Sequence, residues 1–423
     1  MSEPQDPLAL KRRNVQLHLI EGALYIASLG ILNAQTVYPS LVRRLGGSDV
    51  AVGLLPVIAY GAYFLPQILG ANLTTRHPFR RPFILKIGIL QRFTILLLGV
   101  SVGLLGARLP GAALAVFFLA FALNQMLGGV MAPAWFDFLA KTVPPGMRGR
   151  VIGLRSSSGG FLSFLSSLVL TAIFVSVPFP LSYSIAFALA FAWQMSSYFV
   201  LRKVIEEEPS PVQQALPPRE LFTKIRTILS ENSVFRQFLA ASSLSTVGLL
   251  PAAFFTVCAF ERLGLQDSAV GVFTMITVGS QVVSALALGW MGDRKGYKST
   301  LLVCAGAMIG ATLIALAAGQ LWMWYLVFAL MGVSFGAEMM LRFNFAVDCA
   351  PEHDRPIYIG VLNVWLAPWY LTNVVGGWVV DAYGYGTLFA IGLAFSVSGF
   401  LLLARVRDPR PSGPPASLAL SSK

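Results

Sequence analysis

The sequence predicts an all-α integral membrane protein in which twelve transmembrane helices form two six-helix bundles. Of its 423 residues, 56% are hydrophobic and only 12% are charged, whereas soluble domains carry about 25% charged residues. Apolar segments of about 20 residues, the length that crosses a bilayer as a helix, recur along the whole chain. A polar segment at mid-chain divides these apolar segments into two sets of six.

Helices are expected rather than barrel strands, because a membrane barrel would show alternating segments of about ten residues, and these are absent. The predicted spans are 16–38, 50–73, 83–106, 111–139, 151–177, 180–201, 234–260, 269–291, 299–318, 321–348, 357–380 and 385–405. Five prolines in these spans are expected to kink helices: Pro56, Pro66, Pro133, Pro251 and Pro368.

The basic residues predict the orientation. Placing alternate loops in the cytoplasm leaves all but five of the 31 Lys and Arg residues on the cytoplasmic side, as the positive-inside rule expects. The exceptions are Arg43, Arg44, Arg108 and Arg262 outside and Arg92 within the third span. Both termini are therefore expected in the cytoplasm, in a bacterial-type inner (plasma) membrane. Because the basic residues lie in short clusters between spans, the net charge of +12 does not indicate nucleic-acid binding.

The chain divides into four predicted parts. Residues 1–203 are the first six-helix bundle, 204–233 a cytoplasmic linker, 234–408 the second bundle and 409–423 a flexible cytoplasmic tail. The linker is rich in charge and proline, a composition that favours a solvated connector over a packed domain. A monomer in contact with membrane lipid is expected.

An internal repeat favours two related halves. At an offset of 207, residues 129–153 match the second half at seven of 25 positions, where background frequencies would supply about two. The matches are Gly129/Gly336, Phe136/Phe343, Phe138/Phe345, Pro144/Pro351, Arg148/Arg355, Ile152/Ile359 and Gly153/Gly360. Duplicated halves are a common construction of secondary transporters.

The loop between the eighth and ninth spans carries a motif. Its residues Gly289-Trp290-Met291-Gly292-Asp293-Arg294-Lys295-Gly296-Tyr297-Lys298 resemble the loop signature G-x-x-x-D-[RK]-x-G-[RK]-[RK] of the major facilitator superfamily, with Tyr297 as the one departure. The resemblance in topology extends over the whole chain. It implies a cytoplasmic gate stabilised by charges, formed by Gly289, Asp293, Arg294, Gly296 and Lys298 with Arg148 and Arg355. Gly289 is expected to allow close helix contact.

The first half departs from that pattern. Its corresponding loop, residues 70–81, has no Asp, so a symmetric two-loop gate is in doubt. The fourth span carries Asn124 and Gln125 where many proton-coupled members have Arg, and the fifth lacks the Gly-Pro pattern of drug antiporters. The plain alternative for the loop motif is a positive-inside turn with glycines for tightness.

Ionisable residues inside spans are costly to bury and are therefore functional candidates. Arg92 either pairs with a carboxylate such as Glu21 or meets an anionic substrate group, and Glu21 is also a candidate proton carrier. Glu338 and Arg342, spaced i and i+4, either neutralise each other or serve substrate recognition and proton coupling. The remaining substrate or coupling candidates are Asn124, Gln125, Asn363, Trp365 and Trp369.

These observations predict secondary transport of a small solute by alternating access, with proton coupling as a finer expectation and the solute unidentified. One alternative is a membrane enzyme acting on lipid, but His18, His77 and His353 are scattered and no catalytic cluster is apparent. A second alternative is a non-transporting solute sensor. The three cysteines lie in or beside apolar segments without metal-ligand spacing, so no metal, cofactor or enzymatic activity is expected.

Overall fold

The computed structural model describes residues 7–209, 218–351 and 354–409, and within these ranges all regular structure is helical. The first half comprises α1 (Pro7–Leu29), α2 (Val37–Arg44), α3 (Asp49–Pro56), α4 (Ala62–Phe64), α5 (Gln67–Thr75), α6 (Arg80–Leu105), α7 (Pro110–Thr142), α8 (Arg148–Ser176) and α9 (Leu181–Leu201). After α10 (Pro218–Glu231), the second half comprises α11 (Ser233–Gly248), α12 (Phe255–Leu263), α13 (Ser268–Lys295), α14 (Tyr297–Ala317), α15 (Leu321–Asp348), α16 (Arg355–Leu366) and α17 (Thr372–Arg405). The predicted tail, 409–423, lies outside the described residues except for its first residue.

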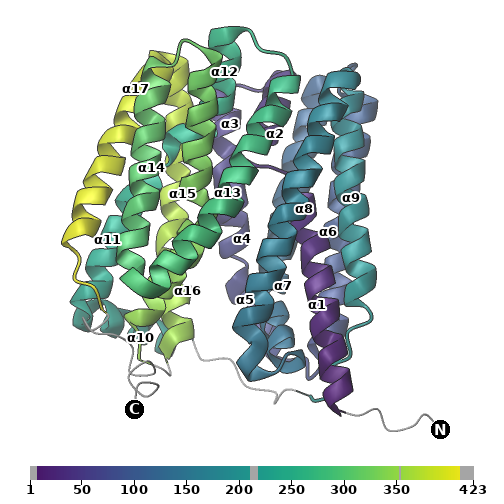
Figure 1. Ribbon diagram of the computed structural model, residues 1–423, viewed down its shortest axis with the longest axis vertical. Helices are drawn as coiled ribbons and strands as arrows, with labels where there is room; N and C mark the ends of the chain where they lie inside the picture. The colour runs from purple at the N-terminus through teal and green to yellow at the C-terminus, as the bar shows by residue number, and fades with distance from the viewer. Residues whose placement is uncertain (1–6, 210–217, 352–353, 410–423) are drawn as a thin grey trace.

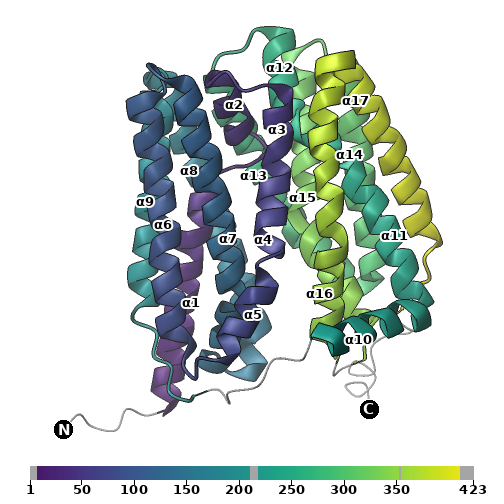
Figure 2. The ribbon, with the colours of Figure 1, turned by 180° about the vertical axis from the view of Figure 1, so that it is seen from behind.

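The helices of each half pack mainly against one another (Figures 1 and 2). In the first half α1 packs on α8 and α9, and α6 on α7; in the second, α15 packs on α13 and α14, and α11 on α17. The halves meet where α8 contacts α13 and α3 contacts α17. α1 begins and α17 ends at the lower end in Figure 1, here the terminal end, while α2 and α12 lie at the opposite, distal end.

The spans agree with a multi-pass membrane protein. Ten helical segments among the described residues are long and apolar enough to cross a bilayer. The last, Ile357–Arg405, has 49 residues, more than twice the roughly 20 that one crossing needs, and Gly384 breaks it with a φ of 80°. Two predicted spans therefore share this segment. α1, which carries three basic residues and Glu21, is not among the ten, and the count of twelve stays a prediction consistent with this arrangement.

The first predicted span, 16–38, is displaced from the observed helix, because α1 ends at Leu29. The side chain of Asn33 explains the end. Its Oδ1 accepts hydrogen bonds from the backbone N–H groups of Gln35 and Thr36, at 3.0 and 3.1 Å. Such an Asx turn competes with continued helix, so the chain leaves the helical path before α2 begins.

Proline breaks three of the long spans. A π-helical segment, η1 (Val57–Gly61), follows Pro56, and Pro66 separates α4 from α5. In the second half, 3₁₀ segments contain Pro251 (η3, Leu250–Ala253) and Pro368 (η5, Ala367–Leu371). Proline causes such breaks because it lacks a backbone N–H and clashes with the preceding turn. Pro133, in contrast, lies well inside a continuous helix, α7.

The predicted connector contains helical structure of its own. Helix α10 occupies its last part and packs against α11. Ile228 of α10 is buried in an apolar cluster with Phe235 and Phe238 of α11. This burial attaches the end of the connector to the second half.

The repeat has a structural counterpart. A Cβ on Gly129 of α7 would meet the backbone carbonyl of Tyr63 in α4, and a Cβ on Gly336 of α15 would meet the backbone of Gln281 in α13. The two glycines, which the repeat aligns, thus allow equivalent close packing of the fourth span on the second and of the tenth on the eighth. Small residues allow such close approach between membrane helices.

The contact between α3 and α17 is close at backbone level. A Cβ on Gly53 would collide with the carbonyl of Asn373, and one on Gly377 would lie 2.5 Å from both the Asp49 carbonyl oxygen and the Val50 Cα. Backbone atoms cannot move aside as a flexible side chain can. A larger residue at either glycine must therefore separate the halves near their distal end.

We expect Gly377→Val to open the distal end. Overpacking typically costs about 1–3 kcal/mol, and 1.4 kcal/mol corresponds to a tenfold change in an equilibrium. A cysteine introduced by Thr36→Cys, at a position fully buried between the halves, should then react with maleimide roughly tenfold faster. Gly386→Val on the same helix is the control, because a Cβ there meets nothing within 4 Å. Equal labelling rates in the two variants would contradict the close-packing argument.

Candidate functional site

A cavity lies between the halves. Its volume is about 410 Å³, within the range of about 300–1,000 Å³ typical of small-molecule sites. Residues of both halves line it. Those that the argument uses are Tyr25, Tyr60, Asn124, Gln125 and Gln194 from the first half, and Gln281, Glu338, Arg342, Asn363 and Tyr370 from the second.

Five of the predicted candidates line this cavity: Asn124, Gln125, Glu338, Arg342 and Asn363. The two amides on α7 are held by the helices around them. The Asn124 amide donates to the Gln91 carbonyl at 3.0 Å and to Thr94 Oγ1 at 2.8 Å, while the Gln125 amide donates to the Ala59 carbonyl at 2.9 Å. These bonds hold the side chains in place at the wall of the cavity. Their roles in transport stay predictions.

Glu338 and Arg342 form an ion pair on α15. The Arg342 guanidinium donates to Glu338 Oε1 at 2.6 Å and to Thr246 Oγ1 of α11 at 3.0 Å. Both side chains are largely buried, at 13% and 9% exposure. The pair therefore brings two opposite charges to the cavity wall without adding net charge, which leaves both predicted interpretations, mutual neutralisation and substrate contact, compatible with the geometry.

Two tyrosines meet across the halves beside the cavity. The rings of Tyr60 and Tyr370 stack with centroids 4.2 Å apart and planes inclined by 17°. Tyr60 lies in the π segment η1 and Tyr370 in the 3₁₀ segment η5. The irregular parts of the second and eleventh spans thus contact each other at the cavity.

Trp365 and Trp369 are not among the residues that line the cavity. Their side chains are 39% and 40% exposed, and the Trp365 indole donates to Ser243 Oγ at 2.9 Å. The two indoles therefore do not line the cavity in this conformation, and their roles as substrate or coupling residues stay predictions. Trp369 lies in the 3₁₀ segment η5 and Trp365 in α16 just before it, so the helix break falls between the two side chains.

A second cavity, of about 190 Å³, lies within the first half. Tyr25 lines both cavities, so they share a wall. The second contains the ion pair of Glu21 on α1 with Arg155 on α8, at 2.5 Å. Ser197 Oγ also donates to Glu21, and the Arg155 guanidinium lies 4.4 Å from the centre of the Trp135 ring. A Cβ on Gly22 would occupy the place of the Arg155 side chain.

Arg155 is a site residue that the sequence reasoning missed. It lies near the start of the predicted fifth span, a position at which a basic residue usually anchors the helix at the membrane interface. In the structure it is instead buried against α1. The available signal was Glu21, a carboxylate inside a span that required a cationic partner. The suggested partner, Arg92, is not that partner, because Arg92 forms no ion pair among the described residues.

The distal end carries ion pairs between the halves, which the sequence did not predict. Across the halves, Arg43 contacts Glu261 at 2.7 Å and donates to Tyr385 Oη at 3.0 Å, and Arg44 contacts Asp267 at 2.7 Å. Within the first half, Arg43 also contacts Asp49 at 2.7 Å. Burial acts against the Arg43 charge, but Tyr385, Asp49 and Glu261 together raise the pKa of its guanidinium. Such partly exposed pairs contribute only about 0–1 kcal/mol each. They connect the halves at the distal end, but they contribute too little free energy to prevent the halves from separating there.

The loop motif spans the end of α13 and the start of α14. Gly296 has a φ of 88°, which only glycine adopts without strain. The Arg294 guanidinium lies 4.1 Å from the centre of the Trp290 ring, and Lys298 donates to the Ala404 carbonyl of α17 at 2.7 Å. The side chain of Asp293 is outside the described part of the chain.

One interpretation of the motif needs correction. A Cβ on Gly289 would meet nothing within 4 Å, so this glycine does not provide close helix contact; Gly292 does, against the ring of Tyr297 and Leu341. Arg148 donates to the carbonyls of Ala140 and Val143 in its own half. Arg355 begins α16 with an exposed side chain. The gate role of these residues stays a prediction.

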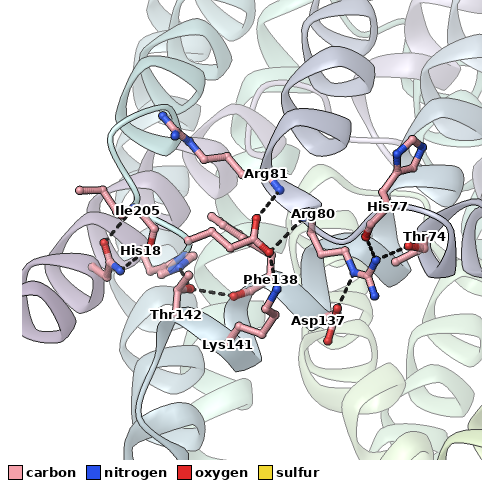
Figure 3. A network of polar contacts seen from close by, with 12 residues as sticks. His18, Thr74, His77, Arg80, Arg81, Asp137, Phe138, Lys141, Thr142 and Ile205 are labelled. Carbon is pink, nitrogen blue, oxygen red and sulfur yellow. Dashed lines mark hydrogen bonds and ion pairs between the residues drawn. The ribbon is translucent and has the colours of Figure 1, made fainter. Parts of the chain in front are cut away.

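The first half has a polar network of its own at the terminal end (Figure 3). Arg80 pairs with Asp137 at 2.6 Å. The Glu206 carboxylate accepts from the backbone N–H groups of Arg80 and Arg81, at 3.0 and 2.8 Å, and pairs with Lys141 at 2.6 Å. The loop of residues 70–81 has no Asp of its own, but carboxylates from α7 and from the start of the connector bind its basic end.

A family comparison decides the identity of the fold. The sequence model of the family described as Major Facilitator Superfamily matches residues 22–367 of this chain and, in a second match, residues 251–421. The chain belongs to the major facilitator superfamily. A relative among curated proteins, the uncharacterised MFS-type transporter YwfA of Bacillus subtilis strain 168, is 24% identical over 384 residues, covering 86% of this chain and 85% of that protein.

Solved structures agree on the fold. A D-xylose–proton symporter superposes with a TM-score of 0.69 at 16% identity, covering 94% of this chain and 98% of that one. A bacterial homologue of the iron transporter ferroportin, in an inward-facing state, gives 0.64 at 15% identity over 95% and 99%. At these identities the likeness shows the superfamily fold alone. Membership of a transporter superfamily points to a transporter rather than to an enzyme.

Proposed function

We propose that this superfamily member is a secondary transporter that moves a small solute through the 410 Å³ cavity by alternating access. One observation carries the proposal. The cavity is lined by both halves, and the ion pairs described between the halves, Arg43–Glu261 and Arg44–Asp267, lie at the distal end. At the terminal end, the ion pairs Arg80–Asp137 and Lys141–Glu206 join the first half to itself and to the start of the connector. This conformation is therefore closed distally.

The distribution of basic residues supports the assignment of sides. Clusters such as Arg12–Arg13 and Arg294–Lys295 lie at the terminal end, which makes that end cytoplasmic under the positive-inside rule. Under this proposal the conformation is inward-facing, the membrane is the cytoplasmic membrane and both termini lie inside. The gate predicted around Asp293 would form in the opposite, outward-facing state.

The broken spans supply a place for movement. The glycine contacts between α3 and α17 hold the distal parts of the second and eleventh spans together. The break η1 is adjacent to α3 in the chain, and the break η5 is adjacent to α17. A change of direction at these breaks lets the terminal parts approach while the distal parts separate. The solute would then lose access from one side as it gains access from the other.

Flux measurement tests the proposal. Purified protein in proteoliposomes with an imposed pH gradient would be screened with pooled metabolites for uptake and for efflux. Saturable flux that requires the protein is expected from at least one pool. Specific binding without flux across every pool would favour the non-transporting sensor instead, and turnover of added lipid without flux would favour the membrane enzyme.

Proton coupling is assigned to Glu338, the carboxylate at the wall of the shared cavity. Glu338→Gln keeps the shape of the side chain but removes its proton-binding charge, so uphill accumulation driven by the pH gradient should fall at least tenfold while exchange of solute between equal pools continues. Glu231→Gln, at an exposed residue of α10, is the control and should behave as the parent. Unchanged accumulation by Glu338→Gln would remove this residue from the coupling mechanism.

A further inference from the structure

The 190 Å³ cavity within the first half has a positive charge that the protein does not neutralise. Three charged residues line it: Glu21, Arg92 and Arg155. The ion pair of Glu21 with Arg155 accounts for two of the charges. Arg92 remains, because it forms no ion pair with any described residue. The lining of this cavity therefore carries one net positive charge, whereas Glu338 and Arg342 cancel in the larger cavity.

The hydrogen-bond and ring contacts described for Arg92 are all to neutral groups. Its Nε donates to the Gln194 carbonyl at 2.7 Å and its Nη1 to the Gly88 carbonyl at 2.8 Å, and the Tyr198 ring lies 5.2 Å from the guanidinium carbon. No hydrogen bond from Nη2 is found within the described part of the chain. The residue is 2% exposed. Arg92 is thus a buried, positioned cation with a donor group to spare.

The position of this charge is costly unless something compensates it. An arginine near the middle of a membrane helix costs about 2.5–3.5 kcal/mol on insertion scales, and arginine does not lose its proton in proteins. Space around it is also preserved, since a Cβ on Gly88 would lie 2.9 Å from Nη1. A cation of this kind, positioned at a cavity wall, is a candidate binding group for an anion.

The other walls describe the body of that anion. They are largely apolar or aromatic, and comprise Tyr25, Tyr63, Gly128, Met131, Ala132, Trp135, Phe136 and Leu201. A planar guanidinium matches a carboxylate in geometry, and one net positive charge matches one negative charge. The cavity size limits the ligand to a small molecule.

We propose that this cavity binds the carboxylate of a small organic monoanion with an aromatic or branched apolar body, that Arg92 recognises the carboxylate, and that such acids are the transported class. The inference rests on the proposed transport function, since Tyr25 joins this cavity to the one between the halves. Arg155 is occupied by Glu21 and acts only by setting the charge balance.

Equilibrium binding tests the site without requiring flux. The probes are phenylacetate, 3-phenylpropionate and indole-3-acetate, each compared with its neutral amide, and the protein is held in phosphatidylcholine nanodiscs at neutral pH. Calorimetry and the thermal unfolding midpoint are the readouts. At least one acid should bind at least tenfold more tightly than its amide. An absence of any preference for acid over amide across the panel would overturn the proposal.

Two independent variants test whether the preference for the acid over its amide depends on Arg92. Arg92→Gln should abolish it, while Lys86→Gln, an equal loss of charge at an exposed position of the same helix, should not. If Arg92→Gln does not fold, Met131→Glu provides the second test, because Met131 lines the same cavity and its sulfur lies 3.5 Å from the Cβ position of Gly88. Its carboxylate should compete with the ligand and remove the preference, whereas Met131→Gln should retain it. Retention of the preference in Met131→Glu would overturn the site.

Flux separates this inference from the proposed function. Transport of a neutral solute by a protein that shows no preference for acids would remove the anion site and leave the transporter. Binding of an acid that depends on Arg92, without flux of that acid, would retain the site and exclude such acids as the transported class.

Discussion

A disulfide formed in the double variant Thr36→Cys/Thr274→Cys is expected to stop transport completely. Thr36 precedes α2 in the first half, Thr274 lies on α13 in the second, and their Oγ1 atoms are 2.6 Å apart. Both residues are fully buried. Cysteines there are within reach of the roughly 3.5–4.5 Å between Cβ atoms that a disulfide requires. Because the bond joins the halves in the distal part, the closed state could no longer open.

The experiment needs a background without the native cysteines, Cys258, Cys304 and Cys349, whose flux is measured first. Flux should fall to the liposome background after oxidation and return after reduction. The control is Gly103→Cys/Ser184→Cys, which joins α6 to α9 inside the first half, where a Cβ on Gly103 would lie 3.2 Å from the Ser184 Cβ. Full flux through the oxidised distal variant would disprove alternating access at this interface.

Removing Arg155 is expected to destabilise the protein by about 3–5 kcal/mol, the usual cost of leaving one member of a buried ion pair without its partner. Arg155→Met would leave the Glu21 carboxylate buried with Ser197 as its remaining described donor. Glu21→Gln would similarly leave Arg155 unpaired, although its contact with the Trp135 ring remains. Each single variant should unfold at a markedly lower temperature in detergent.

The double variant Glu21→Gln/Arg155→Met should recover most of that loss, because no unpaired charge remains. A thermodynamic cycle over the four proteins would give the coupling between the two residues. Arg148→Gln serves as a comparison, since Arg148 bonds only to backbone carbonyls among the described contacts and its loss should cost far less. Additive effects of the two single variants would mean that the ion pair contributes nothing to stability.

The membrane fold was accessible from the sequence because hydrophobic length, loop charge and proline act locally. Gly384 separates the last two predicted spans, and Pro56, Pro251 and Pro368 mark breaks in the helices. The end of α1 was harder to derive. It depends on a side-chain turn at Asn33 within an otherwise apolar run.

The candidate site was predictable only in part, because lining a cavity depends on how the halves face each other. Glu338 and Asn363 were selected as polar residues within spans, and both line the larger cavity. The partner of Glu21 and the distal partners of Arg43 and Arg44 were not derivable. The pairs Glu21–Arg155, Arg43–Glu261 and Arg44–Asp267 each join residues at least 134 positions apart, and no local pattern reports that proximity.

The Glu206 network also limits how far the halves can separate. Glu206 is fastened to α6 and α7, and α10 is fastened to α11, so the covalent tether that must span the halves is reduced to residues 207–217. The twelve Cα–Cα steps from residue 206 to residue 218 span at most about 40–43 Å. The tether therefore sets a maximum distance between the halves, because residues 206 and 218 cannot lie further apart than that length in any state of the transport cycle.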